Sequence, residues 1–187
     1  DIVIEQVANV RACYLPGMRE AESDCAMRLR AMAAAKTDTR VDIEKAIAKA
    51  GKAQGITYTA QQEQTLRIAA RRRVCVITGG PGTGKTTTVR AILNMFDCMG
   101  LTTLLTAPTG RAAKRMTELT GREASTVHRL LGAGYAEGSD IVFQKDEDQP
   151  LEGDAVIMDE CSMVDITLMA ALLRALPEEC RLVLVGD

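Results

Sequence analysis

The chain has 187 residues, of which 47% are hydrophobic and 26% charged, and its formal net charge is −2. This length and apolar content suffice for one folded domain with an appendage. The near-neutral charge excludes a chain that is basic throughout, so any nucleic-acid partner must meet a local patch of Lys and Arg.

Cysteine usage and hydropathy predict where the protein resides. Six cysteines are scattered along the chain without a C-x-x-C pair, which predicts reduced thiols and a cytoplasmic location. The apolar run Ile2–Ile4 is too short for a signal peptide or a membrane span, and no later segment reaches the required length, so we expect no membrane partner. The chain begins at Asp1 rather than Met and stops at Asp187 directly after a predicted strand, so we expect it to be part of a longer protein.

Residues 1–55 predict a small helical segment that precedes the main domain. Apolar side chains recur at helical spacing over residues 16–35, and Ile43 and Ile47 lie four apart in a shorter helix predicted at 41–50. This pattern indicates helix packing, with a partner-binding role as the alternative. We assign no chemistry to the segment.

Residues 56–187 alternate strands with helices and predict an α/β domain. Thr59 and Gln62 have the spacing of a capping box at the start of a helix that runs to the cluster Arg71–Arg73. Apolar strands separated by helix-sized crossovers predict a parallel sheet covered on both faces. Residues 132–153 are rich in Gly, Asp and Glu and predict a surface loop or small hairpin. The predicted strands are 74–78, 102–106, 155–159 and 182–185, and the predicted helices between them are 85–95, 111–119, 126–131 and 166–176.

The first strand runs directly into G-x-x-x-x-G-K-T and then into a helix, which is the required context of a phosphate-binding P-loop. Its glycines permit positive φ, so backbone N–H groups and the helix N-terminus can surround a phosphate. We expect Lys85 to reach the β- and γ-phosphates and the Thr86 hydroxyl to ligate Mg²⁺. The residues expected to bind the nucleotide here are Gly80, Pro81, Gly82, Thr83, Gly84, Lys85, Thr86 and Thr87.

The third strand delivers Asp159 and Glu160 to the carboxyl edge of the sheet, where ligands of open α/β folds bind. We expect Asp159 to hold Mg²⁺ through its water shell and Glu160 to deprotonate the attacking water, which makes Lys85 and Glu160 the expected catalytic residues. Asp165 suits a purely structural role as a helix cap. The chain has no N-K-x-D and no D-x-x-G at this strand end, so it is not a signalling GTPase, and a small-molecule kinase has little use for a water-activating glutamate. An ATP-hydrolysing motor remains.

Five segments occur in a fixed order that resembles the motifs of RecD-family DNA helicases, superfamily 1 enzymes that move 5′ to 3′ on single strands. The form D-E-x-S-M of the acidic motif is typical of that branch. The short spacing at 116–125 resembles the stand-alone RecD-like helicases more than the RecD subunit of RecBCD. The resemblance is strong over residues 58–187. The segments are TGGPGTGKTTT (78–88), APTGRAAKR (107–115), STVHRLL (125–131), DECSMVD (159–165) and LVGD (184–187).

The resemblance implies a RecA-like P-loop NTPase domain, the first motor domain, incomplete at its C-terminus. It implies the order 1-4-3-2 for the predicted strands. It also implies that Gln62 reads the adenine edge, because a side-chain amide offers both a donor and an acceptor. Capping of the helix is the competing role for this side chain.

The resemblance also implies contacts to single-stranded DNA. Hydroxyl groups, a free N–H at a helix start and an Arg are the groups that contact phosphates. Arg111, Lys114 and Arg115 fall on one helical face and form the local basic patch, with a solvated charged face as the alternative. His128, the single histidine, either positions the DNA loop or only packs. The residues expected to contact DNA are Pro108, Thr109, Gly110, Arg111, Thr126 and His128.

The implied function is that of an ATP-dependent 5′-to-3′ DNA helicase motor domain in DNA repair or recombination, with ATP and Mg²⁺ as cofactors. Its partners are single-stranded DNA and a second RecA-like domain of the same longer chain, and the protein is expected to be monomeric. Asp187 falls at the start of a γ-phosphate sensor motif. We expect these 187 residues alone to bind nucleotide weakly and to unwind no duplex.

Two other functions fit the same residues. A conjugative relaxase-type helicase shares much of this pattern and would carry a nicking domain with a histidine cluster elsewhere. A non-motor nucleotide-binding scaffold would retain the P-loop alone. The presence of Lys85, Asp159 and Glu160 together argues against a scaffold.

Overall fold

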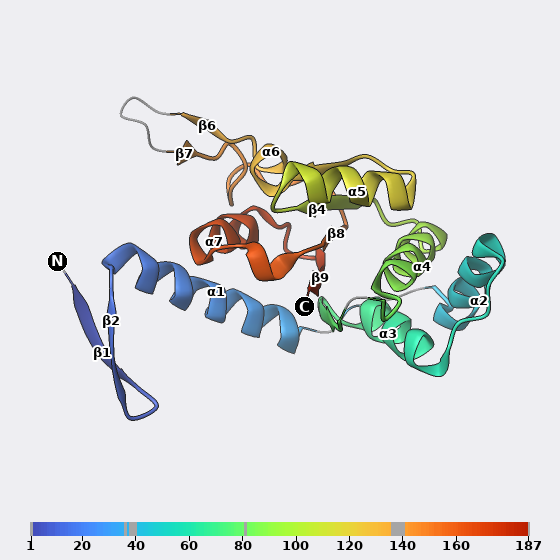
Figure 1. Cartoon of the computed structure of the whole chain (residues 1–187), viewed down its shortest axis with the longest axis horizontal. Helices are drawn as coiled ribbons and strands as arrows, with labels where there is room; N and C mark the ends of the chain where they lie inside the picture. Colours follow the sequence, from blue (N-terminus) through green and yellow to red (C-terminus); the bar gives the residue numbers. More distant parts are fainter. Residues whose placement is uncertain (1, 36, 38–40, 81, 136–140, 187) are drawn as a thin grey trace.

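A computed structural model describes residues 2–35, 37, 41–80, 82–135 and 141–186. Its centre is a five-stranded sheet in the order β3-β9-β8-β4-β5, in which every neighbouring pair is parallel (Figure 1). The four predicted strands are present in the predicted order 1-4-3-2, and β5 adds an edge strand that we did not predict. The strands are β3 (Val74–Thr78), β4 (Thr103–Ala107), β5 (Ala124–Thr126), β8 (Ala155–Met158) and β9 (Arg181–Gly186).

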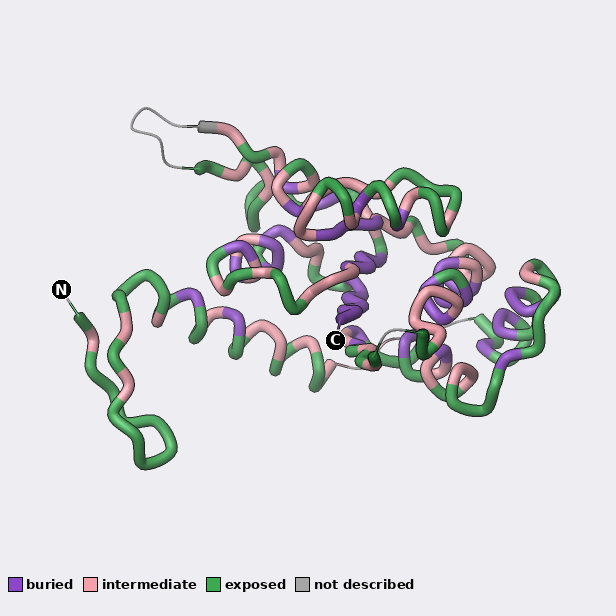
Figure 2. Tube along the Cα trace, in the orientation of Figure 1, coloured by how far each residue is buried: buried purple, intermediate pink, exposed green. Residues whose placement is uncertain are grey.

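The central strands β8 and β9 are buried along their whole length, as Figure 2 shows. Because successive side chains in a strand point to opposite faces, each strand contributes to two separate cores. Ile157 and Val183 belong to one apolar cluster, whereas Val156 and Leu182 belong to the other. This confirms the prediction of a parallel sheet covered on both faces.

Helices cover both faces of the sheet. One cluster joins its first face to helices that include the P-loop helix, and the other joins its second face to α7 and α1. The predicted helices are all present, with α6 shorter than expected because Thr126 is its N-cap rather than its first residue. On the first face lie α2 (Ile43–Gln54), α3 (Ala60–Arg71), α4 (Lys85–Cys98) and α5 (Gly110–Thr120); on the second lie α1 (Pro16–Ala34), α6 (Val127–Leu130) and α7 (Ile166–Ala175).

The N-terminal helices pack onto the sheet domain. Ala21 and Cys25 of α1 are buried against α7, and Ile47 of α2 joins the core formed with α3 and α4. Asp24 accepts hydrogen bonds from Arg28 at 2.8 Å and from Arg174 of α7 at 2.7 Å. The α1–α7 contact therefore combines apolar burial with an ion pair between the helices.

A β-hairpin precedes α1 and was not predicted, so the N-terminal segment is not purely helical. Strands β1 (Val3–Val7) and β2 (Val10–Tyr14) pair antiparallel and project away from the remainder (Figure 1). The connecting Ala8 and Asn9 have φ of 48° and 68°, as a tight hairpin turn with two left-handed residues requires.

The segment after α6 forms the small hairpin that was one of the two predicted alternatives. Strands β6 (Gly134–Tyr135) and β7 (Ile141–Val142) pair antiparallel. A 3₁₀ turn, η1 (Cys161–Met163), follows β8. Within the described ranges, none of the helices is long and apolar enough to cross a membrane.

Candidate active site

The strand register brings the predicted site residues to one edge of the sheet. Thr78 of β3 lies opposite Gly186 of β9, and Met158 of β8 lies opposite Leu184 of β9. Because parallel strands end at the same edge, the P-loop after β3 and the acidic pair after β8 emerge side by side with β9 between them. The two motifs are therefore close in space although they are far apart in the sequence.

The P-loop has the backbone that its glycines predict. Gly82 and Gly84 are left-handed, with φ of 78° and 82°. The Thr83 hydroxyl donates to the Gly80 carbonyl at 2.9 Å, and the Lys85 ammonium donates to the Gly79 carbonyl. Predicted residue Pro81 lies outside the described residues. The loop thus ends at the N-terminus of α4, where backbone N–H groups and the helix dipole favour an anion.

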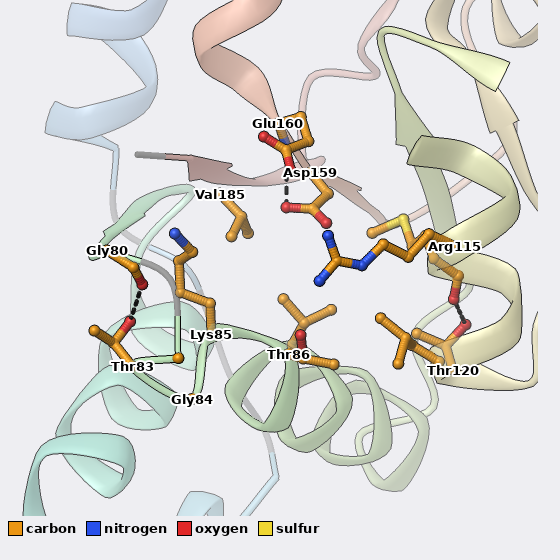
Figure 3. A pocket seen from close by; sticks show the side chains of 14 residues that line it. Gly80, Thr83, Gly84, Lys85, Thr86, Arg115, Thr120, Asp159, Glu160 and Val185 are labelled. Atoms are coloured by element: carbon orange, nitrogen blue, oxygen red, sulfur yellow. Dashed lines mark hydrogen bonds between the residues drawn. The ribbon is translucent and has the colours of Figure 1, made fainter. Parts of the chain in front are cut away.

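A cavity of about 390 Å³ opens between the P-loop, the acidic pair and α5. Its walls include Lys85 and Thr86 on one side and Asp159 and Glu160 on the other (Figure 3). All predicted catalytic and metal-binding residues therefore surround one space. Its lining also contains Gly80, Gly82, Thr83, Gly84, Val89, Arg115, Met116, Leu119, Thr120 and Val185.

A second cavity of about 590 Å³ shares Thr83 and Lys85 with the first and extends to Gln62. Gln62 and Thr59 form the predicted capping box, in which each side chain accepts a hydrogen bond from the backbone of the other residue. The Gln62 amide nitrogen lies 3.7 Å from where a Cβ at Gly84 would be. Gln62 therefore caps α3 and also lies beside the P-loop. Predicted residue Thr87, the third residue of α4, lines neither cavity.

The acidic pair is held by backbone hydrogen bonds. The Asp159 N–H donates to the Thr106 carbonyl at 3.0 Å, and the Glu160 N–H donates to Asp159 Oδ1 at 2.9 Å. Glu160 has a φ of 54°, which is left-handed and strained for a residue with a side chain. Such strain occurs preferentially at functional positions.

Two residues that follow the acidic pair, Cys161 and Asp165, have shifted pKa values. Burial raises the pKa of the Cys161 thiol, and the charges of Asp159 and Glu160 act in the same direction. Asp165 accepts a hydrogen bond from the Leu168 N–H at 2.8 Å and caps α7, as predicted. Hydrogen bonds from Thr167 and from Leu168 lower the pKa of Asp165.

The oxygen ligands in the first cavity fit Mg²⁺. The Thr86 hydroxyl and the Asp159 carboxylate line the same space, and oxygen atoms are the ligands that Mg²⁺ prefers. Within the described part of the chain, no group of three or more His, Cys, Asp or Glu could hold a metal ion. This partial ligand set is typical of Mg²⁺ sites completed by substrate phosphates rather than by an all-protein cage.

The segments predicted to contact DNA follow neighbouring strands. Ala107 of β4 lies opposite Thr126 of β5, so the Pro108 loop and the start of α6 are adjacent. The hydroxyls of Thr109 and Thr126 both accept a hydrogen bond from a backbone N–H at 3.2 Å and cap α5 and α6. Since a hydroxyl accepts and donates at once, each proton can still be donated to a phosphate. Gly110 begins α5 and is exposed.

Two predicted residues have surroundings that the sequence did not specify. The His128 ring packs against Phe143 with centroids 6.0 Å apart and a tilt of 47°. Arg111, Lys114 and Arg115 are all exposed on α5, and the Arg115 side chain also extends into the first cavity toward Asp159 (Figure 3). The assignment of all three cations to one basic patch stays a prediction, and the cavity contact of Arg115 is an addition to it. Helical periodicity could group the three cations but could not say which of them faces the cavity.

Comparison with known proteins gives one family match and several relatives. A family model described as "AAA domain" matches residues 62–187. The ATP-dependent RecD2 DNA helicase of Deinococcus radiodurans is 41% identical over 175 residues, which cover 93% of this chain and 23% of that protein. The RecBCD enzyme subunit RecD of Mycolicibacterium smegmatis is 38% identical over 150 residues, 68% of this chain and 27% of that protein. The chain spans about a quarter of the length of these two relatives.

Proposed function

The chain belongs to the AAA domain family and its relatives are RecD-like DNA helicases; from that premise we propose that it is the first motor domain of an ATP-dependent DNA helicase. One observation carries the proposal. The P-loop and the acidic pair line a common cavity, while the Pro108 loop and the Thr126 helix start leave the same sheet edge from adjacent strands. In this proposal, the nucleotide site and the site for single-stranded DNA lie at the same edge of one sheet.

In the proposed nucleotide site, different residues of the cavity have different roles in ATP hydrolysis. The N–H groups at the start of α4 and the Lys85 ammonium bind the phosphates, and Thr86 and Asp159 hold Mg²⁺. When bound, Mg²⁺ neutralises charge on the phosphate oxygens. Glu160 orients the attacking water and accepts its proton. The backbone hydrogen bonds that fix Asp159 and Glu160 support these separate roles.

We further propose that the nucleotide extends from the first cavity into the second. The two cavities meet at Thr83 and Lys85, so phosphates at the P-loop would place the base toward Gln62. The Gln62 amide uses its oxygen in the capping box, and its NH₂ group and second lone pair are suited to an adenine edge. This arrangement supports adenine selection by a residue that also caps a helix.

On the DNA side, the proposed contacts are Pro108, Thr109, Gly110 and Arg111 together with Thr126 and His128. Both threonine hydroxyls retain a proton to donate, and the exposed Arg111 guanidinium supplies the cation for a phosphate. The His128–Phe143 contact supports the interpretation that His128 positions the loop rather than bonding a base.

The remaining parts of the proposal rest on family resemblance. They are 5′-to-3′ polarity, coupling of hydrolysis to translocation and unwinding, action as a monomer, and a second RecA-like domain that supplies an arginine to the transition state. The unpaired state of all six cysteines supports a cytoplasmic location.

The decisive test is ATP hydrolysis by the full-length protein with and without a poly-dT oligonucleotide. We expect the oligonucleotide to raise the rate, and Lys85→Ala to abolish hydrolysis in both conditions. A rate that ignores the oligonucleotide would contradict the motor function and favour a nucleotide-binding scaffold. The 187 residues alone should unwind no duplex, which a strand-displacement assay checks.

A further inference from the structure

Arg115 is the cation in the first cavity that the proposed function has not used. Its side chain leaves α5 and extends toward Asp159, in the space that Thr86 also faces (Figure 3). Thr86 and Asp159 are the two residues proposed to hold Mg²⁺. The guanidinium therefore lies where a divalent cation would be attracted.

Two cations cannot occupy this place together at low cost. A guanidinium that points toward Asp159 repels a second cation in the same space, because like charges repel at short range. When Mg²⁺ and nucleotide bind, either Arg115 moves away or the metal binds more weakly. The position of Arg115 would therefore influence the affinity of the proposed Mg²⁺ site.

The same helix reaches the proposed DNA contacts. Helix α5 begins at Gly110 directly after Thr109, and Arg111 precedes Arg115 by four residues, which places both on one helix face. The helix is capped by the Thr109 hydroxyl at its start and by left-handed Gly121, φ 71°, at its end. Because Arg111 and Arg115 lie one turn apart on the same helix, a displacement of the start of α5 by bound DNA would also displace Arg115.

We propose that Arg115 is a positioning residue that competes with Mg²⁺ for Asp159 and is withdrawn when single-stranded DNA binds at the start of α5. This inference rests on the proposed function, because it needs both a nucleotide site and a DNA site. By reciprocity, DNA raises the affinity for Mg²⁺ with nucleotide, and Mg²⁺ with nucleotide raises the affinity for DNA by the same factor.

The experiment titrates MgCl₂ into full-length protein with a fluorescent ADP analogue, with and without a dT oligonucleotide. For the unsubstituted protein, the oligonucleotide should lower the Mg²⁺ concentration at half-maximal binding by roughly 5-fold or more. Arg115→Gln should show the low midpoint without DNA and no further shift with it. Arg115→Lys, which keeps the charge, should retain the shift. Arg90→Gln removes an exposed arginine of α4 and should behave as the unsubstituted protein.

Two results would overturn the inference: an Arg115→Gln protein with the original midpoint and the original DNA shift, or an unsubstituted protein whose midpoint ignores DNA. Arg115→Met replaces the Gln variant if circular dichroism shows that the latter is unfolded. DNA-stimulated hydrolysis is measured on the same preparations. If DNA stimulates hydrolysis but Arg115→Gln leaves the Mg²⁺ midpoint and its DNA shift unchanged, only this inference fails. If DNA does not stimulate hydrolysis by the unsubstituted protein, the proposed function fails.

Discussion

Thr59 and Gln62 exchange two hydrogen bonds: the Gln62 N–H donates to Thr59 Oγ1 at 3.2 Å, and the Thr59 N–H donates to Gln62 Oε1 at 3.0 Å. This pair allows capping and adenine recognition to be separated. Thr59→Ala should lower the free energy of unfolding by about 1 kcal/mol and leave nucleotide preference intact. Urea unfolding and competition between ATP and GTP measure the two effects.

Gln62→Glu is the matched variant, because Glu also completes a capping box but cannot donate to the adenine ring. We expect unchanged unfolding and an ATP affinity lower by roughly 3- to 10-fold, the value of one hydrogen bond. Equal ATP affinity in the Gln62→Glu protein would leave Gln62 with a capping role only.

Glu160 combines a proposed catalytic role with a left-handed backbone, so two substitutions should separate function from stability. Glu160→Gln should bind nucleotide but hydrolyse ATP roughly 10²- to 10⁴-fold more slowly, because the amide cannot accept the proton of the water. Glu160→Gly should be equally slow yet more stable by about 1 kcal/mol, since glycine adopts this φ without strain. Single-turnover hydrolysis and thermal unfolding test the pair. A Glu160→Gly protein of lower stability would show that the backbone is not strained there.

Arg111 is proposed to contact a DNA phosphate, and such a contact has a salt signature. Arg111→Ala should weaken binding of a dT oligonucleotide and reduce the slope of log K against log salt by about 0.7, the value for one phosphate contact on a single strand. Fluorescence anisotropy over a range of KCl concentrations gives the slope. Arg90→Ala removes an exposed charge from α4 and serves as the control. If both variants reduced the slope equally, the effect of Arg111 would come from the net charge of the protein and not from a specific phosphate contact.

Asp24 joins α1 to α7 and should make the stability of the chain depend on acid pH. Burial raises the pKa of Asp24, but hydrogen bonds and charges of Arg174 and Arg28 outweigh it and hold the pKa below the ordinary 3.8. The stabilisation is therefore present above pH 3.8 and is lost as pH falls through the lowered pKa.

Asp24→Asn should lower the free energy of unfolding by about 1 kcal/mol at pH 7, where the charged hydrogen bonds are intact. The difference from the unsubstituted chain should shrink as the pH falls below 3.8. Urea denaturation between pH 2 and pH 7 measures this difference in the free energy of unfolding. Glu20→Gln, on the exposed side of α1, is the control. A pH-independent difference would assign the effect to packing.

The sequence predicted the elements whose signals are local. The strand at Val74–Thr78 was predicted with its observed bounds, because a continuous apolar run meets a glycine-rich loop. The hairpin of residues 3–14 was missed because its turn is Ala8-Asn9 rather than a glycine-containing pair. Strand β5 was missed because three residues, Ala124–Thr126, are too few to show a period.

In the candidate site too, the residues with a local sequence signal were predicted and those without one were missed. Lys85, Thr86, Asp159 and Glu160 were predicted to converge, since each follows a strand of one parallel sheet, and they line one cavity. The direction of Arg115 was not predictable, because it depends on how α5 packs against β4 and β5 rather than on helical spacing. Residues that line a site from a neighbouring helix carry no motif signal of their own.

The position of β9 has a consequence for synthesis of the protein. β9 comes last in the described chain, yet it separates β3 from β8, pairing Val76 with Leu184 and Ile157 with Val183. During synthesis, the P-loop and the acidic motif are complete before β9 is made. Until β9 inserts between β3 and β8, the two motifs cannot take their final positions. Non-local pairing of this kind is slow. The nucleotide site should therefore form only after residue 186 leaves the ribosome, and until then β3 and β8 expose unpaired edges that are open to chaperones.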